Sequence, residues 1–166
     1  AKASAIVDKY LAEKLKDATF GERVFFGSYE QDYNTTNGRE KIEWLVLTKK
    51  DSKVLLISDK ALDCRPYNTS YVDITWETCS LRQWLNETFL NNAFSSAEEA
   101  MIADTSVSAS KNPKYSTAPG NATTDKVFLL SINEVNRYFG SDEASQCVPT
   151  AYATTNGAWR RSDTYT

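Results

Sequence analysis

The chain contains no histidine among its 166 residues. This absence excludes Ser-His-Asp and Cys-His catalysis, and it excludes every zinc site with an imidazole ligand. Cysteines are few: Cys64, Cys79 and Cys147 are isolated and lack the C-x-x-C spacing of metal and redox sites. Two interpretations stay open, which are buried free thiols and a bridge between Cys64 and Cys79 that closes a short loop.

Long apolar runs are also absent, since no stretch approaches the roughly 20 residues that span a bilayer. We therefore expect no membrane insertion by this chain. The formal net charge of −3 argues against a phosphate-backbone ligand, so nucleic acid is not an expected partner. The length suits one domain with a sizeable core. No signal peptide is visible, although a chain that starts at Ala1 is compatible with the earlier removal of one.

What the sequence does contain is one strongly patterned helix, between Trp76 and Phe94. Apolar residues in it recur at positions i, i+3, i+4 and i+8, which predicts one buried stripe. These residues are Leu81, Trp84, Leu85 and Phe89. The polar residues between them are expected to face solvent. They are Arg82, Asn86 and Glu87.

Three pairs of residues in the sequence have the spacing of a capping box. The pairs with this spacing are Ser80 with Gln83, Ser95 with Glu98, and Ser131 with Glu134. In such a box the serine hydroxyl accepts the N3 amide, and the Glu or Gln side chain returns to the N-cap amide. The boxes predict helices that begin at these three serines. Gly140 follows the third helix, where a C′ glycine is expected.

Strands are predicted from short apolar or alternating runs. These runs cover residues 23–28, 42–48, 53–58, 105–109 and 126–130. The second and third are joined by the polar turn 49–52 and predict a β-hairpin. Because both faces of residues 44–47 are apolar, that strand is expected to be central in its sheet. Residues 3–17 predict an amphipathic helix.

Several separate motifs add a further constraint. They are FGSYEQD at residues 26–32, IEW at 42–44, ALDC at 61–64 with PYN at 66–68, TWE at 75–77 with WLN at 84–86, and DKVFLLS at 125–131 with EV at 134–135. In this order, from about Phe20 to Trp159, they resemble the bacterial DUF6273 domain family.

This resemblance implies an α+β domain with a C-type-lectin-like mixed sheet and two to four short helices. It divides the chain into an N-terminal helix, residues 1–19, and the domain itself, residues 20–166. Family members usually continue into a Trp-Trp-Leu-Arg-Ser-Pro-like motif and closing strands, and this sequence stops near that position. An unpaired sheet edge would then be left. We therefore expect a partner, either a complementary C-terminal segment or a swapped dimer.

The family resemblance also implies a location. Members occur in surface or multidomain proteins of gut Firmicutes, which favours a cell-surface or secreted protein, while a cytoplasmic location stays open. It implies no cofactor and no established ligand.

Aromatic residues among turn residues are the candidates for ligand contact, because long loops concentrate binding residues. The predicted ligand-binding residues are Tyr67, Tyr71, Tyr115, Asn121 and Trp159, of which Tyr115 and Asn121 lie in the long loop 111–125. For most aromatic residues the core is the better interpretation. Trp44, Trp76 and Trp84 are expected there.

A metal site has weaker support. Oxygen ligands in one loop are offered by Asp32, Asn34, Asn37 and Glu40. Their spacing does not match an EF-hand loop, and the Glu-Pro-Asn and Trp-Asn-Asp signatures of calcium-binding C-type-lectin-like folds are absent. A solvated turn is therefore the preferred interpretation. No metal or other cofactor is expected, and calcium is allowed but not supported by a motif.

Carboxylate catalysis is the remaining alternative, because a glycosidase needs two carboxylates about 5 to 9.5 Å apart. Acidic residues that could supply such a pair are Glu30, Asp32, Asp63, Asp73, Glu77 and Asp125. For Glu77, at the start of the patterned helix, interaction with the helix dipole is the preferred interpretation.

We expect a non-catalytic recognition module that binds a glycan or a surface protein. The alternatives are a carboxylate-dependent hydrolase acting on carbohydrate and a purely structural protein-interaction domain. A hydrolase predicts a deep cleft with two acidic groups of unequal pKa, whereas an interaction domain predicts a flat exposed apolar patch.

Overall fold

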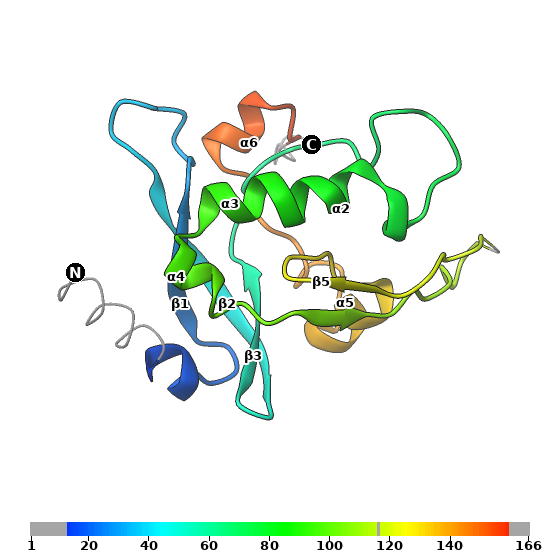
Figure 1. Ribbon diagram of the computed structural model, residues 1–166, viewed down its shortest axis with the longest axis horizontal. Coiled ribbons are helices and arrows are strands. Elements are labelled where there is room, and N and C mark those ends of the chain that lie inside the picture. The colour runs from blue at the N-terminus through cyan, green and yellow to red at the C-terminus, as the bar shows by residue number, and fades with distance from the viewer. Residues whose placement is uncertain (1–12, 116, 160–166) are drawn as a thin grey trace, which may run out of the picture. The chain divides into compact units, whose positions relative to one another are not determined.

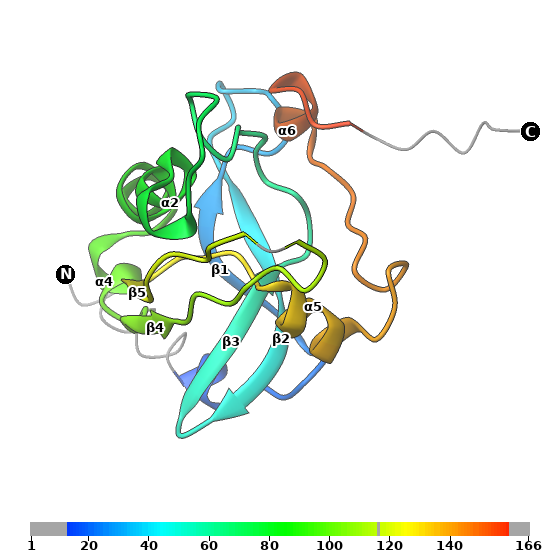
Figure 2. The same ribbon diagram turned by 90° about the vertical axis from the view of Figure 1, so that its right-hand side faces the viewer.

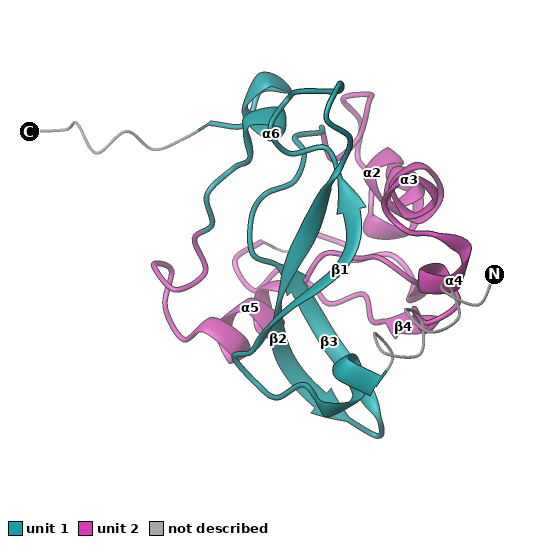
Figure 3. Ribbon diagram, turned by 90° about the vertical axis from the view of Figure 1, so that its left-hand side faces the viewer, with its two compact units in different colours: residues 1–65, 147–166 teal, residues 66–146 magenta. Residues whose placement is uncertain are grey.

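Strands dominate the first third of the chain and short helices the rest (Figure 1). The computed structural model describes residues 13–115 and 117–159. The described chain is an α+β structure with a few short helices, as predicted, but its strands form two antiparallel sheets where one mixed sheet was predicted. It divides into two compact units, coloured separately in Figure 3. Unit 1 comprises residues 1–65 and 147–166, and unit 2 comprises residues 66–146.

Unit 1 is built on a three-stranded antiparallel sheet. Its strands are β1 (Arg23–Tyr29), β2 (Glu40–Lys50) and β3 (Lys53–Ser58), in the order β1-β2-β3. The predicted hairpin and the central position of β2 are thus confirmed. The turn between β2 and β3 places Asp51 and Ser52 at positive φ, the backbone that two-residue hairpin turns require.

The core of unit 1 lies on one face of this sheet. Ala18, Val24 and Val46 are buried, and partly buried residues pack against them. These are Leu15, Trp44, Val54 and Leu56. Of the predicted helix 3–17, residues 13–17 are helical, and the remainder lies outside the described residues.

Unit 2 contains the patterned helix, which runs without interruption from Ser80 to Ala93. It follows η1 (Trp76–Thr78) and consists of α2 (Ser80–Trp84), a π-helical turn (Leu85–Phe89) and α3 (Leu90–Ala93) (Figure 1). The predicted stripe is buried most completely at Phe89, whose ring contacts those of Trp84 and Phe94. A buried aromatic cluster therefore fixes this helix within unit 2.

The predicted capping box at the start of this helix does not form. Its N-cap is Cys79, and no side chain caps it. The Ser80 hydroxyl instead accepts a hydrogen bond from the Thr69 amide at 3.0 Å, while the Asn68 side chain accepts from the Ser80 amide at 3.1 Å. The loop before the helix has taken the place of the predicted capping box.

Arg82 and Asn86 were expected to face solvent, but both make contacts inside unit 2. Arg82 Nε donates to the fully buried carboxylate of Asp125 at 2.7 Å. The same carboxylate accepts from Trp76 Nε1 at 3.0 Å and from the Thr123 hydroxyl at 2.6 Å. Three donors thus compensate the burial of one charge, which a buried carboxylate requires.

The segment after Asp125 was predicted as a strand over 126–130 and is not one. The strand β5 (Thr123–Asp125) ends before it and pairs with β4 (Thr105–Val107) (Figure 2). The Asn86 side chain accepts from the Lys126 and Val127 amides at 2.8 and 3.2 Å and donates to the Val127 carbonyl at 2.9 Å. The Asn86 side chain therefore makes the hydrogen bonds that a neighbouring strand was expected to make with residues 126 and 127.

The second and third capping boxes are confirmed. They begin α4 (Ser96–Glu99), capped by Ser95 with Glu98, and α5 (Ile132–Phe139), capped by Ser131 with Glu134. Gly140 closes α5 in the left-handed conformation with φ of 69°. Among the described residues no helix has both the length and the apolar character needed to cross a membrane.

The cysteines are free thiols. Cys79 is buried, Cys64 is partly buried and Cys147 is exposed. The structure therefore contains no bridge between Cys64 and Cys79.

Candidate functional site

A concave site of about 520 Å³ lies in unit 1. Four segments line it: the middle of β1 with the loop that follows the strand, the start of β2, the connection after β3, and the segment that leads into α6 (Ala151–Thr155). The lining residues are Phe25, Gln31, Asp32, Glu40, Lys41, Glu43, Asp59, Lys60, Leu62, Val148, Pro149, Thr150 and Ala151. We call this site the unit 1 pocket.

The walls of the unit 1 pocket are fixed by backbone hydrogen bonds between segments far apart in the sequence. The Ala61 amide donates to the Val148 carbonyl at 3.2 Å, and the Thr150 amide donates to the Ala61 carbonyl at 3.0 Å. The amide of Tyr152 donates to the Gln31 carbonyl at 3.1 Å. These bonds give the pocket walls a defined geometry, as expected of a site formed before ligand arrives.

The short helix α6 is held next to the pocket by Asp63. This side chain is only 6 % exposed and accepts hydrogen bonds from the Tyr29 hydroxyl at 2.9 Å, the Cys64 amide at 2.7 Å and the Asn156 side chain at 2.7 Å. Burial, with the hydrogen bond to Asp63 next in importance, raises the pKa of Tyr29 well above its ordinary value. Tyr29 therefore stays protonated and serves as a donor.

The chemistry of the pocket is mixed. Its lining contributes carboxylate acceptors, lysine donors and one aromatic ring, that of Phe25. Phe25 is 55 % exposed although its neighbours Val24 and Phe26 on β1 are buried. A phenyl ring on the solvent face of a strand gains little from burial, and this ring belongs to the lining of the pocket.

Some of these carboxylates already have partners. Asp59 accepts from Arg23 at 2.8 Å, and Glu43 lies 3.6 Å from the same guanidinium. Glu40 accepts from the Gln31 amide at 2.7 Å. Because a carboxylate offers about four acceptor positions, these groups keep capacity for a ligand while their orientation is fixed by the protein.

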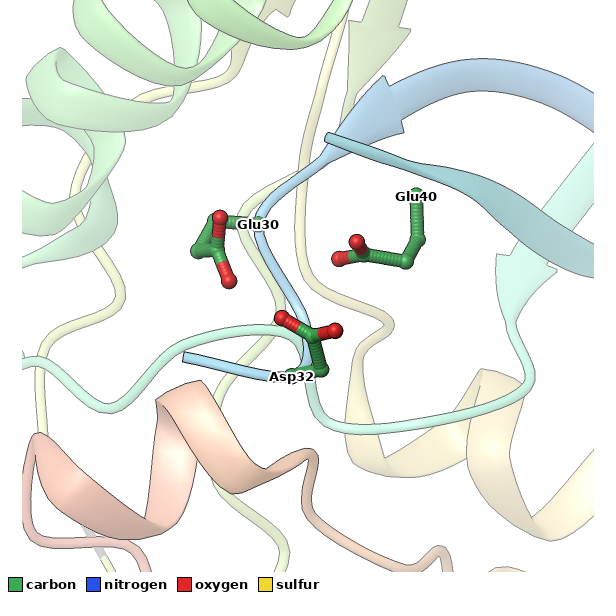
Figure 4. Close-up of side chains that lie close together, drawn as sticks. All are labelled: Glu30, Asp32 and Glu40. Atoms are coloured by element: carbon green, nitrogen blue, oxygen red, sulfur yellow. The ribbon is translucent and has the colours of Figure 1, made fainter. Parts of the chain in front are cut away.

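One edge of the pocket carries an acidic group formed by Glu30, Asp32 and Glu40. Their carboxylate oxygens lie within 4.8 Å of one another and point into a shared space from the loop after β1 and the start of β2 (Figure 4). Oxygen donors of this kind suit Ca²⁺. The group joins two residues of the predicted oxygen-ligand loop, Asp32 and Glu40, with Glu30, which that prediction had missed.

The other two residues of the predicted loop, Asn34 and Asn37, serve the loop itself. The Asn34 amide donates to Asp32 at 2.8 Å, and the Asn37 side chain donates to the other Asp32 oxygen at 2.7 Å. These two bonds, that of Asn37 first, lower the pKa of Asp32 below its ordinary value. The hydrogen bonds thus support the interpretation as a solvated turn.

None of the five residues predicted from the sequence is among the described residues that line the unit 1 pocket. The structure describes all five, and all are exposed at the surface. Trp159 belongs to unit 1, and the other four belong to unit 2. They are Tyr67, Tyr71, Tyr115 and Asn121. Their role in binding stays a prediction.

Two of the four lie around the start of the patterned helix. The Tyr67 carbonyl accepts from the Leu81 amide at 3.2 Å, and burial, with a contribution from Cys79, raises the pKa of Tyr67 to about 12. Asn121 donates through its amide and side chain to Glu77 at 3.1 and 3.0 Å. The carboxylate of Glu77 therefore binds the long loop, and it also lies in the first turn of η1, where interaction with the helix dipole was predicted.

Sequence reasoning missed the unit 1 pocket because its walls come from residues 25–62 and 148–151. One signal was present in the sequence. The predicted strand 23–28 has three consecutive apolar residues, Val24, Phe25 and Phe26, and in a strand with one buried face the middle one points the other way.

The matching family model is described as a domain of unknown function, DUF6273, and it matches residues 51–164. No curated protein and no solved structure gives a significant match. Several residues that carried the resemblance, including Trp76, Asn86 and Asp125, make the buried contacts of unit 2. Because the match covers more than half of the sequence, the chain belongs to the DUF6273 family.

Proposed function

We propose that this domain is a non-catalytic recognition module that binds a glycan in the unit 1 pocket. The observation that carries the proposal is the composition of the pocket, in which carboxylates and lysines surround the exposed ring of Phe25. Sugar hydroxyls both donate and accept hydrogen bonds, so they can use both kinds of polar group. The C–H face of a sugar ring can then pack on the phenyl ring.

The concave shape favours this function over a purely structural interaction domain. Such a domain would be expected to present a flat apolar patch. The unit 1 pocket instead has a volume of about 520 Å³ and charged residues on several of its walls. Its volume falls in the range of small-molecule and saccharide-sized sites.

A carboxylate-dependent hydrolase has less support. The acidic group brings carboxylates close enough for a retaining glycosidase, which uses a separation of about 5 to 5.5 Å. A retaining glycosidase also needs a general acid with a raised pKa, and Asp32 does not fit that role because hydrogen bonds lower its pKa. Asp32 therefore stays ionised at neutral pH and is suited to accepting hydrogen bonds.

The proposal includes three broader elements that rest on the family resemblance. The fold is of the C-type-lectin-like type, the domain belongs to a bacterial protein of the cell surface or the secreted fraction, and its ligand is a glycan or a glycosylated surface protein. A complementary segment or a swapped dimer remains a prediction.

Glycan-array binding tests the proposed function. The full chain is applied in calcium and in EDTA, and the affinity for any bound glycan is then measured by calorimetry. We expect the same glycans in both buffers, because the proposed contacts are made by side chains of the protein and need no metal ion. Silence on the array in both buffers would contradict the proposal.

Variants locate the site. Phe25→Ala should weaken binding at least about tenfold, because it removes the ring on which the sugar packs, about 1.4 kcal/mol. Phe20→Ala is the matched control, since Phe20 is also an exposed phenylalanine of unit 1 but does not line the pocket. If Tyr115→Ala or Trp159→Ala abolishes binding and Phe25→Ala does not, the ligand binds at the residues predicted from the sequence instead.

A further inference from the structure

Tyr33 combines two unfavourable features at the edge of the unit 1 pocket. Its φ angle is +65°, in the left-handed region that side chains other than glycine, asparagine and aspartate rarely adopt. Its side chain is nevertheless 60 % exposed. Neither the backbone nor burial explains a tyrosine here, and strained residues that persist without structural gain are concentrated at functional sites.

The ring of Tyr33 does have a defined neighbour. Its centroid lies 6.4 Å from that of Tyr152, with an angle of 39° between the ring planes. Tyr152 in turn packs edge-on against the buried Tyr29 at 5.8 Å. The Tyr152 amide is bonded to the Gln31 carbonyl. The ring of Tyr152 therefore contacts the ring of Tyr33, and much of the Tyr33 side chain is still exposed to water.

This aromatic pair adjoins the unit 1 pocket through the chain itself. Asp32, which lines the pocket, directly precedes Tyr33, and Ala151, which also lines it, directly precedes Tyr152. Gln31, whose carbonyl holds Tyr152, is a third lining residue. The backbone at Tyr33 and at Tyr152 thus continues directly from residues that line the pocket, in the loop after β1 and at the start of α6.

We propose that Tyr33, supported by Tyr152, forms a second subsite, so that the ligand is an oligosaccharide bound along its length. This inference rests on the proposed glycan-binding function and adds the size of the ligand to it. One sugar unit occupies the pocket at Phe25, and a further unit packs on the exposed face of Tyr33. The strained backbone is retained because it presents the ring at that place.

The test measures binding of the full chain to arrays that carry each glycan as a series of one to six sugar units. We expect the wild-type protein to bind members of three or more units at least fivefold more tightly than the single unit. Tyr33→Asn should reduce the long members to the level of the single unit and leave the single unit unchanged. Phe20→Ala is the control, because Phe20 is an exposed aromatic residue of unit 1 that does not line the pocket.

Thermal unfolding supplies a readout without ligand. Asparagine tolerates positive φ better than tyrosine does, so the Tyr33→Asn variant should keep its melting temperature within about 2 °C or gain a little. A fall of several degrees together with an unchanged length preference would assign Tyr33 a purely structural role and overturn the inference. Equal binding of short and long members by the wild type would overturn it too, while leaving the pocket intact. Absence of binding to every member would overturn the proposed function itself.

Discussion

Asp32 and Asp125 show how hydrogen bonds hold the same side chain in two different settings. Asp125 is fully buried, and its charge is compensated by Arg82, with Trp76 and Thr123 as further donors. Asp32 is exposed and accepts from the Asn34 amide and the Asn37 side chain. The hydrogen bonds to Asp125 join segments inside unit 2, whereas those to Asp32 orient a carboxylate that lines the pocket.

The Asn37 hydrogen bond is the largest cause of the lowered pKa of Asp32. In Asn37→Ala we therefore expect the pKa of Asp32 to rise toward its ordinary value of about 3.9. A carboxyl with a lowered pKa stabilises the folded state above the unfolded pKa, and this contribution is lost as the pH falls through the folded value. The stability difference between variant and wild type should thus be present at neutral pH and vanish in acid.

An NMR titration of the side-chain carboxyl measures this pKa directly. Asn91→Ala serves as the control, because Asn91 bonds the Glu87 carbonyl in unit 2 and has no bond to Asp32. An Asp32 pKa that is the same in Asn37→Ala and in the wild type would show that the bond does not form in solution.

At the scale of elements, the correct predictions are those that depend on local sequence. The boxes at Ser95 and Ser131 form because donor and acceptor lie three residues apart on the same turn. The box at Ser80 fails although its spacing is the same, since Asn68 and Thr69 bond Ser80 instead. A pattern defined over four neighbouring residues does not include a competing partner 11 or 12 residues away.

The predicted strand at 126–130 fails for a related reason. Its apolar residues are typical of a buried strand, but the amides of Lys126 and Val127 bond the Asn86 side chain, 40 residues earlier in the chain. The unit 1 pocket likewise unites Phe25 with Thr150. The sequence pattern predicts the elements well, whereas the site depends on contacts between elements, which periodicity does not encode.

The hydrogen bonds of Asn86 lead to a prediction about the stability of the protein. Asn86→Ala leaves two amides and one carbonyl of residues 126–127 without this partner. Unsatisfied buried polar groups cost about 1–3 kcal/mol, so the free energy of unfolding should fall by about that amount in a urea titration. Gln83→Ala, at an exposed position on α2 where the side chain donates to Glu87, should change it by less than about 0.5 kcal/mol. Similar losses in both variants would argue against the role of Asn86 as a substitute strand partner.

At the scale of the whole molecule, the chain leaves unit 1 after Arg65, forms unit 2 and returns to unit 1 at Cys147. The returning residues 148–151 form one wall of the unit 1 pocket. The site is therefore complete only when segments separated by more than 80 residues have come together, through the bonds of Ala61 with Val148 and Thr150. A pocket with this construction depends on the folding of the discontinuous unit as a whole.

This organisation predicts two slowly exchanging regions, one in each unit. In unit 1 they are the amides of β2, which is paired on both sides, and in unit 2 those of the helix from Ser80 to Ala93. The connecting segments 66–73 and 141–147 are largely exposed and contain turns, so their amides should exchange fastest, because local opening costs least where few contacts are broken. Hydrogen exchange measured by mass spectrometry on peptides that cover these four regions checks the order. If segment 141–147 were protected as strongly as β2, the two units would not be separated by loosely held connections, and the division of the chain would have to be redrawn.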